Sequence, residues 1–119
     1  IYTKINDGEL IGCCGLTHIH WTFGTAEISL YIGKGDLYLD SQFAPDAWGT
    51  LMRYGFEELR MNKLWVEVYE FDEKKIALCN RFNFHLDGRL RENTYKLGKY
   101  WDSLVFSLLR RERGLEMMI

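Results

Sequence analysis

The sequence predicts a single α/β domain with elements in the order β-β-β-α-β-α-β-β. Residues 25–32 alternate apolar and polar side chains, which is typical of a half-buried strand. Residues 48–59 instead place apolar side chains at helical spacing. The chain has 119 residues, a common length for one domain and too short for two separate cores. We therefore treat residues 1–119 as one domain.

The first part of the chain is expected to form an antiparallel meander. Asn6, Asp7 and Gly8 favour a hairpin turn because they tolerate positive φ angles. Ala26, Ile28, Leu30 and Ile32 share one face of the third strand. The expected strands are Ile1–Ile5, Leu10–Ile19 and Thr25–Ile32, with a connection at Trp21–Gly24.

Helices and strands alternate after this meander. Pro45 suits the first turn of a helix, and Gly55 on the apolar stripe suggests close packing against a strand. Asp72 is expected to cap a second helix that ends near Phe82. The apolar stripe of the first helix comprises Trp48, Leu51, Met52, Phe56 and Leu59. The remaining expected strands are Lys63–Phe71 in the centre of the sheet, then Arg89–Tyr95 and Tyr100–Leu109, joined by a turn at Lys96–Lys99.

The composition argues against several classes of function. The net charge of −2 offers no general attraction to nucleic acid, and no apolar stretch is long enough to span a membrane. Three cysteines, two of them adjacent, fit reduced thiols better than a disulfide framework, so we expect a cytoplasmic protein. Because the chain begins at Ile1, it is expected to start inside a longer protein.

Several segments resemble the GNAT superfamily of acyl-CoA-dependent N-acetyltransferases. The similarity is to the branch that modifies ribosomal protein N-termini, polyamines and nucleotide-linked amino sugars. The segments that carry it are Gly8–Gly12 with Gly15–Leu16, Thr25–Ile28, Arg53–Leu59, Lys63–Tyr69, Gly88–Glu92, Tyr95–Lys96, Gly98–Tyr100 and Asp102.

The resemblance implies a mostly antiparallel sheet with one central parallel pair, here without the family's first strand and first two helices. It also implies direct transfer of an acetyl group from acetyl-CoA to a primary amine, on a small molecule or a peptide. The backbone amides of Ser29, Leu30, Tyr31 and Ile32 would polarise the thioester carbonyl. An uncovered sheet edge and face suggest a homo-oligomer such as a homodimer.

The family's pyrophosphate-binding loop aligns with residues 39–44, where Gln42, Phe43 and Ala44 precede the first helix. Only Ala44 follows the family pattern. Gln42 replaces the central glycine that lets a phosphate approach the backbone, and Asp40 adds a negative charge. We therefore expect acetyl-CoA to bind weakly.

Three further positions follow from the resemblance. Asp72 takes the place of an asparagine that contacts CoA, and Cys79 takes the place of the tyrosine that protonates the departing thiolate. Cys79 also fits a core residue, since it lies on an apolar helix stripe. Glu27, on the polar face of its strand, is the candidate base for the acceptor amine, or else a solvent-facing carboxylate.

Two alternatives stay open from the residues alone. Cys14, His18 and His20 would share one face of an unbroken strand and could ligate zinc, although the spacing matches no known zinc module, and we predict no metal. The altered cofactor motifs also fit a degenerate GNAT-fold module that binds or assembles without catalysis.

Overall fold

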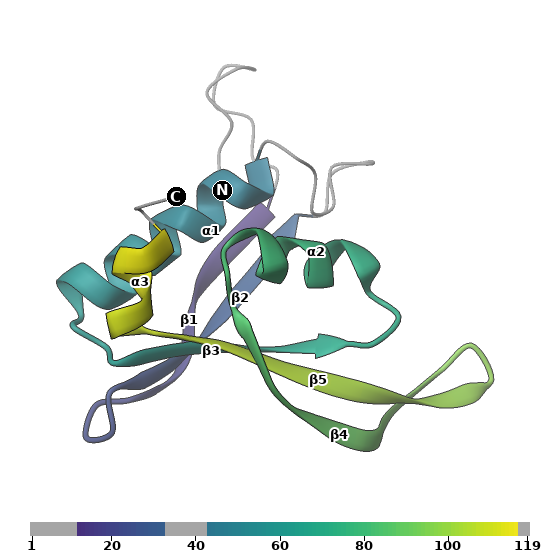
Figure 1. The fold of residues 1–119 in the computed structure, drawn as a ribbon. Coiled ribbons are helices and arrows are strands. Elements are labelled where there is room, and N and C mark those ends of the chain that lie inside the picture. Colours follow the sequence, from purple (N-terminus) through teal and green to yellow (C-terminus); the bar gives the residue numbers. More distant parts are fainter. Residues whose placement is uncertain (1–11, 33–42, 117–119) are drawn as a thin grey trace.

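A computed structural model describes residues 12–32 and 43–116 of the chain (Figure 1). The strand expected at Ile1–Ile5 and the loop at residues 39–42 lie outside these described residues. In chain order the elements are β1 (Gly12–His20), β2 (Thr25–Ile32), α1 (Phe43–Arg53), the π-helical turn η1 (Tyr54–Glu58), β3 (Lys63–Tyr69), α2 (Glu73–Arg81), β4 (His85–Lys96), β5 (Lys99–Leu109) and α3 (Arg110–Glu116).

The five described strands form one mixed sheet in the order β1-β2-β3-β5-β4. β2 and β3 are parallel, and the other neighbouring pairs are antiparallel. The expected α/β class with one central parallel pair is therefore confirmed. β3 occupies the middle of the sheet, as its apolar and aromatic sequence predicted.

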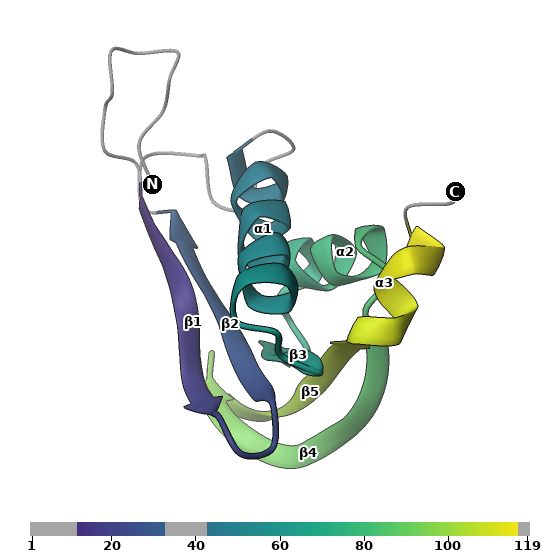
Figure 2. The same cartoon turned by 90° about the vertical axis from the view of Figure 1, so that its left-hand side faces the viewer.

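The three α-helices lie on one face of the sheet and leave the other face without a helix in the described part of the chain (Figure 2). The helix-side face of β2 carries Ala26, Ile28 and Leu30, all buried. These side chains join Trp48 of α1 and the inner residues of β3 and β5 in one core. We call the opposite, helix-free face the outer face.

The stripe predicted from Trp48 to Leu59 is not one continuous α-helix. α1 ends at Arg53, and a π-helical turn follows in which the Leu59 amide donates to the Tyr54 carbonyl at 3.0 Å. The expected role of Gly55 is confirmed, because a Cβ atom there would lie 2.9 Å from Leu64 Cδ2 on β3. The wider turn brings the backbone at Gly55 close to the sheet.

The second half follows the predicted order with two differences. β4 begins at His85, not near Arg89, and His85 Nε2 lies 3.0 Å from Glu112 Oε2. A short helix, α3, follows β5, whereas the predicted order ended with that strand. The turn between β4 and β5 is as expected, and Leu97 and Gly98 both have positive φ angles there.

Candidate functional site

The central feature of the site is a split between the two parallel strands. β2 and β3 are in register at only three positions, from Thr25↔Lys63 to Glu27↔Trp65, and then diverge. Beyond Glu27, β2 pairs only with β1 among the described strands. The β3-facing edge of Ser29–Ile32, the segment predicted to contact the acyl group, therefore borders the split.

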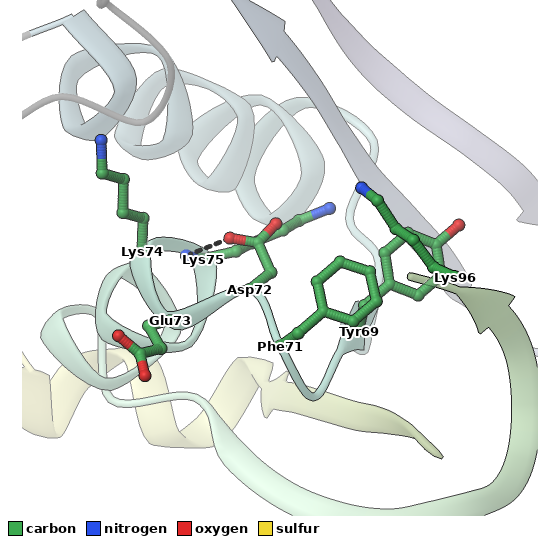
Figure 3. Close-up of a pocket in the computed structure, with 7 residues that line it drawn as sticks. All are labelled: Tyr69, Phe71, Asp72, Glu73, Lys74, Lys75 and Lys96. Carbon is green, nitrogen blue, oxygen red and sulfur yellow. Dashed lines mark hydrogen bonds between the residues drawn. The ribbon is translucent and has the colours of Figure 1, made fainter. Parts of the chain in front are cut away.

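A pocket of about 500 Å³ lies at the carboxyl end of β3 and the start of α2 (Figure 3). Tyr69 and Phe71 stack with ring centroids 5.3 Å apart, and the Lys96 ammonium lies 4.8 Å from the Phe71 centroid. The pocket thus combines aromatic faces with an excess of positive charge. Its lining residues are Tyr69, Phe71, Asp72, Glu73, Lys74, Lys75 and Lys96.

Asp72 caps α2 as predicted. Its Oδ1 atom accepts a hydrogen bond from the Lys75 backbone amide at 3.1 Å. The side chain thereby uses one of the helix-end amides that a phosphate or carbonyl ligand could otherwise approach. The predicted contact of Asp72 with a cofactor stays a prediction, and the pocket lies beside this residue.

An ionic network ties the end of β3 to the hairpin that carries Lys96. Arg89 Nη1 donates to Asp102 Oδ2 at 2.8 Å and to Glu70 Oε2 at 3.0 Å. The Asp102 carboxylate also accepts from the Glu92 amide. The bond from Arg89, followed by the Glu92 amide, lowers the pKa of Asp102. The network orients the exposed β4–β5 hairpin relative to the pocket.

Glu27 lies at the closed end of the split, on the outer face. Its Oε1 atom is 2.6 Å from His18 Nδ1 and accepts a hydrogen bond from Thr17 Oγ1 at 3.3 Å. The side chain is 19% exposed, so solvent or a ligand can reach it. Its partner across the last parallel pair is Trp65, which is half-buried.

Cys79 lies in the core. It is fully buried, and burial raises its pKa from 9.0 to about 12. A proton donor for a thiolate works best with a pKa near or below that of the leaving thiol, so this environment weighs against the predicted donor role. The alternative interpretation, a packed core residue, describes its observed position.

Phe43 and Ala44 begin α1, and Ala44 is fully buried while Phe43 is half-buried against the core. Gln42 lies outside the described residues. The contact of all three with acetyl-CoA therefore stays a prediction.

The unbroken strand required for the zinc alternative is absent. A register shift interrupts β1 between Thr17 and His20, and His18 has a positive φ of 48°. Among the residues that the structure describes, no group of three His, Cys, Asp or Glu side chains could hold a metal ion. No described helix is long and apolar enough to cross a membrane.

Sequence reasoning missed His18 as a partner of Glu27, and the lysines around the pocket. Lys74 and Lys75 follow the capping residue, but Lys96 comes from a hairpin more than twenty residues further along. Strand periodicity indicates which residues form the hairpin, but not that Lys96 near its turn lies against the Phe71 ring.

Comparisons with known proteins place this geometry in a family. A family model described as acetyltransferase (GNAT) domain matches residues 2–85. The chain belongs to the GNAT acetyltransferase family. It is similar to the uncharacterized N-acetyltransferase p20 of Bacillus licheniformis, at 35% identity over 87% of this chain and 57% of that protein.

Two further proteins extend the comparison. Bacillus subtilis YdaF, to which a ribosomal N-acetyltransferase activity is ascribed, is 31% identical over 89% of this chain and 57% of that protein. The fold is also that of a spermidine/spermine N-acetyltransferase from Vibrio cholerae, with a TM-score of 0.81, 23% identity, and coverage of 92% of this chain and 65% of that one. The chain thus spans somewhat more than half the length of the two Bacillus relatives.

Proposed function

We propose that this GNAT domain transfers an acetyl group from acetyl-CoA to a primary amine. The observation that carries the proposal is the split between β2 and β3. The charged, aromatic pocket lies at the open end of β3, and Glu27 lies at the closed end on the outer face. A thioester held along the split would be reachable by an amine that approaches Glu27.

The residues around the pocket have the chemistry that acetyl-CoA requires. Its phosphates are anionic, and the pocket has three lysines against two carboxylates. Tyr69 and Phe71 offer apolar surface beside them. The β3-facing backbone edge of Ser29–Ile32 has amides that can donate to a thioester carbonyl, which stabilises negative charge as it develops.

In this proposal Glu27 assists the acceptor amine. An amine is a nucleophile only after it loses its extra proton, and a carboxylate or its hydrogen-bonded partner can take that proton. The amine nitrogen then forms a bond to the carbonyl carbon while the C–S bond breaks. The sulfur leaves as a thiolate and takes up the second amine proton, so the products are an amide and free CoA.

The second candidate is a binding or assembly module that does not transfer acetyl groups. The burial of Cys79 favours it, because the family's proton donor then has no equivalent on α2. The proposed reaction does not need this donor, because the second amine proton can reach the thiolate directly or through a water molecule, and positioning of the two reactants supplies much of the rate.

Turnover of acetyl-CoA decides between the two. The panel comprises spermidine, a peptide with a ribosomal-protein N-terminus, and an amino sugar. We expect acetylation of at least one amine, and a loss on the order of 100-fold in kcat/KM for Glu27→Gln. The matched control is Glu67→Gln, which removes a half-buried carboxylate from the neighbouring strand. Absence of turnover on every amine, with acetyl-CoA bound, would favour the non-catalytic module.

A further inference from the structure

We infer that His18 and Glu27 act as one unit in which His18, not Glu27 alone, removes the proton from the acceptor amine. This inference rests on the proposed function. Its starting observation is the contact between His18 Nδ1 and Glu27 Oε1, 2.6 Å apart at the closed end of the split. The carboxylate holds one ring nitrogen, which leaves Nε2 as the proton acceptor.

The backbone is bent at His18 in a way that creates this contact. Leu16 pairs with the inward-facing Ile28, and Thr17 pairs with the outward-facing Glu27. In a regular strand His18 would therefore point to the helix side, on the same face as Leu16. The register shift between Thr17 and His20, together with the positive φ at His18, instead allows its ring to meet Glu27.

A positive φ is uncommon for residues other than glycine, and histidine is among the side chains that adopt it more readily. Strained backbone and β-bulges occur often beside active sites, where they redirect a side chain. A surface ion pair contributes little stability, so the contact with Glu27 does not by itself account for the irregularity in β1. A role of the redirected imidazole in proton transfer accounts for it.

The surroundings of His18 suit proton transfer. The ring is 73% exposed and therefore open to an incoming amine, while Glu27 is 19% exposed. The Trp65 ring lies 6.2 Å from the imidazole, centroid to centroid, and provides an aromatic face for a cationic substrate. Thr17 also donates to Glu27 Oε1, so two side chains of β1 hold the carboxylate.

Other titratable groups surround this pair. On the outer face of β3, Lys63 and Glu67 lie two residues to either side of Trp65. Tyr31 lies on the same face of β2, and His20 of β1 stacks on Phe23 with ring centroids 4.2 Å apart. None of these four groups forms a described hydrogen bond with His18, whereas Glu27 does.

The inferred step is a simple proton transfer. The ammonium form of the acceptor gives one proton to His18 Nε2 and becomes a neutral amine, and His18 becomes an imidazolium ion that Glu27 stabilises. The imidazolium later returns this proton to solvent. No redox change or further reactant is involved.

The first test requires no turnover. Long-range ¹H–¹⁵N spectra of the full chain report which ring nitrogen of a neutral histidine carries the proton. We expect His18 to be protonated at Nδ1 in the parent, and this tautomer to lose population in Glu27→Gln but not in Glu67→Gln. An unchanged tautomer population in Glu27→Gln would overturn the inference that His18 and Glu27 act as one unit.

The second test uses the pH dependence of kcat/KM. We expect His18→Gln to lower kcat/KM on the order of 100-fold and to remove the acidic limb of the profile, whereas His20→Gln changes neither. The double variant His18→Gln, Glu27→Gln should be little worse than either single variant, because residues that act together are non-additive. An acidic limb and rate retained in His18→Gln would overturn the inference while leaving the proposed function intact. A parent that acetylates no amine would overturn both.

Discussion

The two edges of β3 are built differently. Along one edge, all seven residues from Lys63 to Tyr69 pair with β5. Along the other, only the first three pair with β2 before the strands separate. β3 is thus fully paired along one edge, and along the other edge it borders the split. The comparison shows how a central strand, normally the most protected part of a sheet, can take part in a site.

The difference predicts where stability and activity are separable. Buried side chains of the β3–β5 pair should affect the free energy of unfolding, because they pack in the core. Side chains beside the split should affect ligand binding and turnover with less effect on unfolding.

The largest expected effect is on the β5 edge. Leu108 is 1% exposed and pairs with Leu64. We expect Leu108→Ala to lower the free energy of unfolding by about 2–5 kcal/mol, since it leaves a cavity in the core. Chemical denaturation measures this, with Leu86→Ala on the exposed part of β4 as the control. A loss no greater than that of the control would contradict a closed, tightly packed edge.

Cys79 of α2 packs in the core together with residues of β2, β3 and β5. Its pKa is raised from 9.0 to about 12 by burial, so the unfolded chain ionises first as the pH rises above about 9. The parent should therefore lose stability relative to Cys79→Ala by about 1.4 kcal/mol per pH unit in this range. Denaturation between pH 8 and about 11 measures the difference.

The control is Cys13→Ala, which replaces an exposed thiol and should keep the pH dependence of the parent. Acetyl transfer should change little in Cys79→Ala, because a buried thiol is a poor proton donor. A collapse of turnover in this variant would restore Cys79 as the donor.

A smaller effect is expected from the segment that precedes α1 in the sequence. Asp40 and Gln42 lie outside the described residues, and the expectation comes from their chemistry. The parent should bind acetyl-CoA no tighter than the high micromolar range. The double variant Asp40→Gly, Gln42→Gly should bind on the order of tenfold tighter, about 1.4 kcal/mol, by calorimetry. Glu58→Gln removes an acidic side chain elsewhere and should not change affinity.

The smallest effect concerns the outer face itself. Tyr31 is 61% exposed there, and the described part of the chain places no helix over this face. We expect the 119-residue chain to self-associate weakly at tens of micromolar in sedimentation experiments, and Tyr31→Lys to reduce it. A clean monomer at these concentrations would contradict the expectation.

Local sequence patterns determined most of the secondary structure. The alternation in residues 25–32 predicted a strand with Ala26 and Ile28 inward, and both are buried. The position of Asp72 before a helical segment predicted that it caps α2, and the glycine at position 55 predicted close packing on β3. These features depend on neighbours within a few residues or on the absence of a side chain, so they can be recognised in one dimension.

The tertiary structure decided how the candidate site is assembled. The split depends on where β2 leaves β3, the pocket depends on Lys96 returning from a distant hairpin, and the contact of His18 with Glu27 depends on a bulge in β1. A regular period would put His18 on the same face as Leu16, and the bulge that lets it meet Glu27 leaves no mark in hydrophobic alternation. Residue types predicted the chemistry of this chain, whereas breaks in strand register, which arise from pairing across the sheet, determined which of those residues meet.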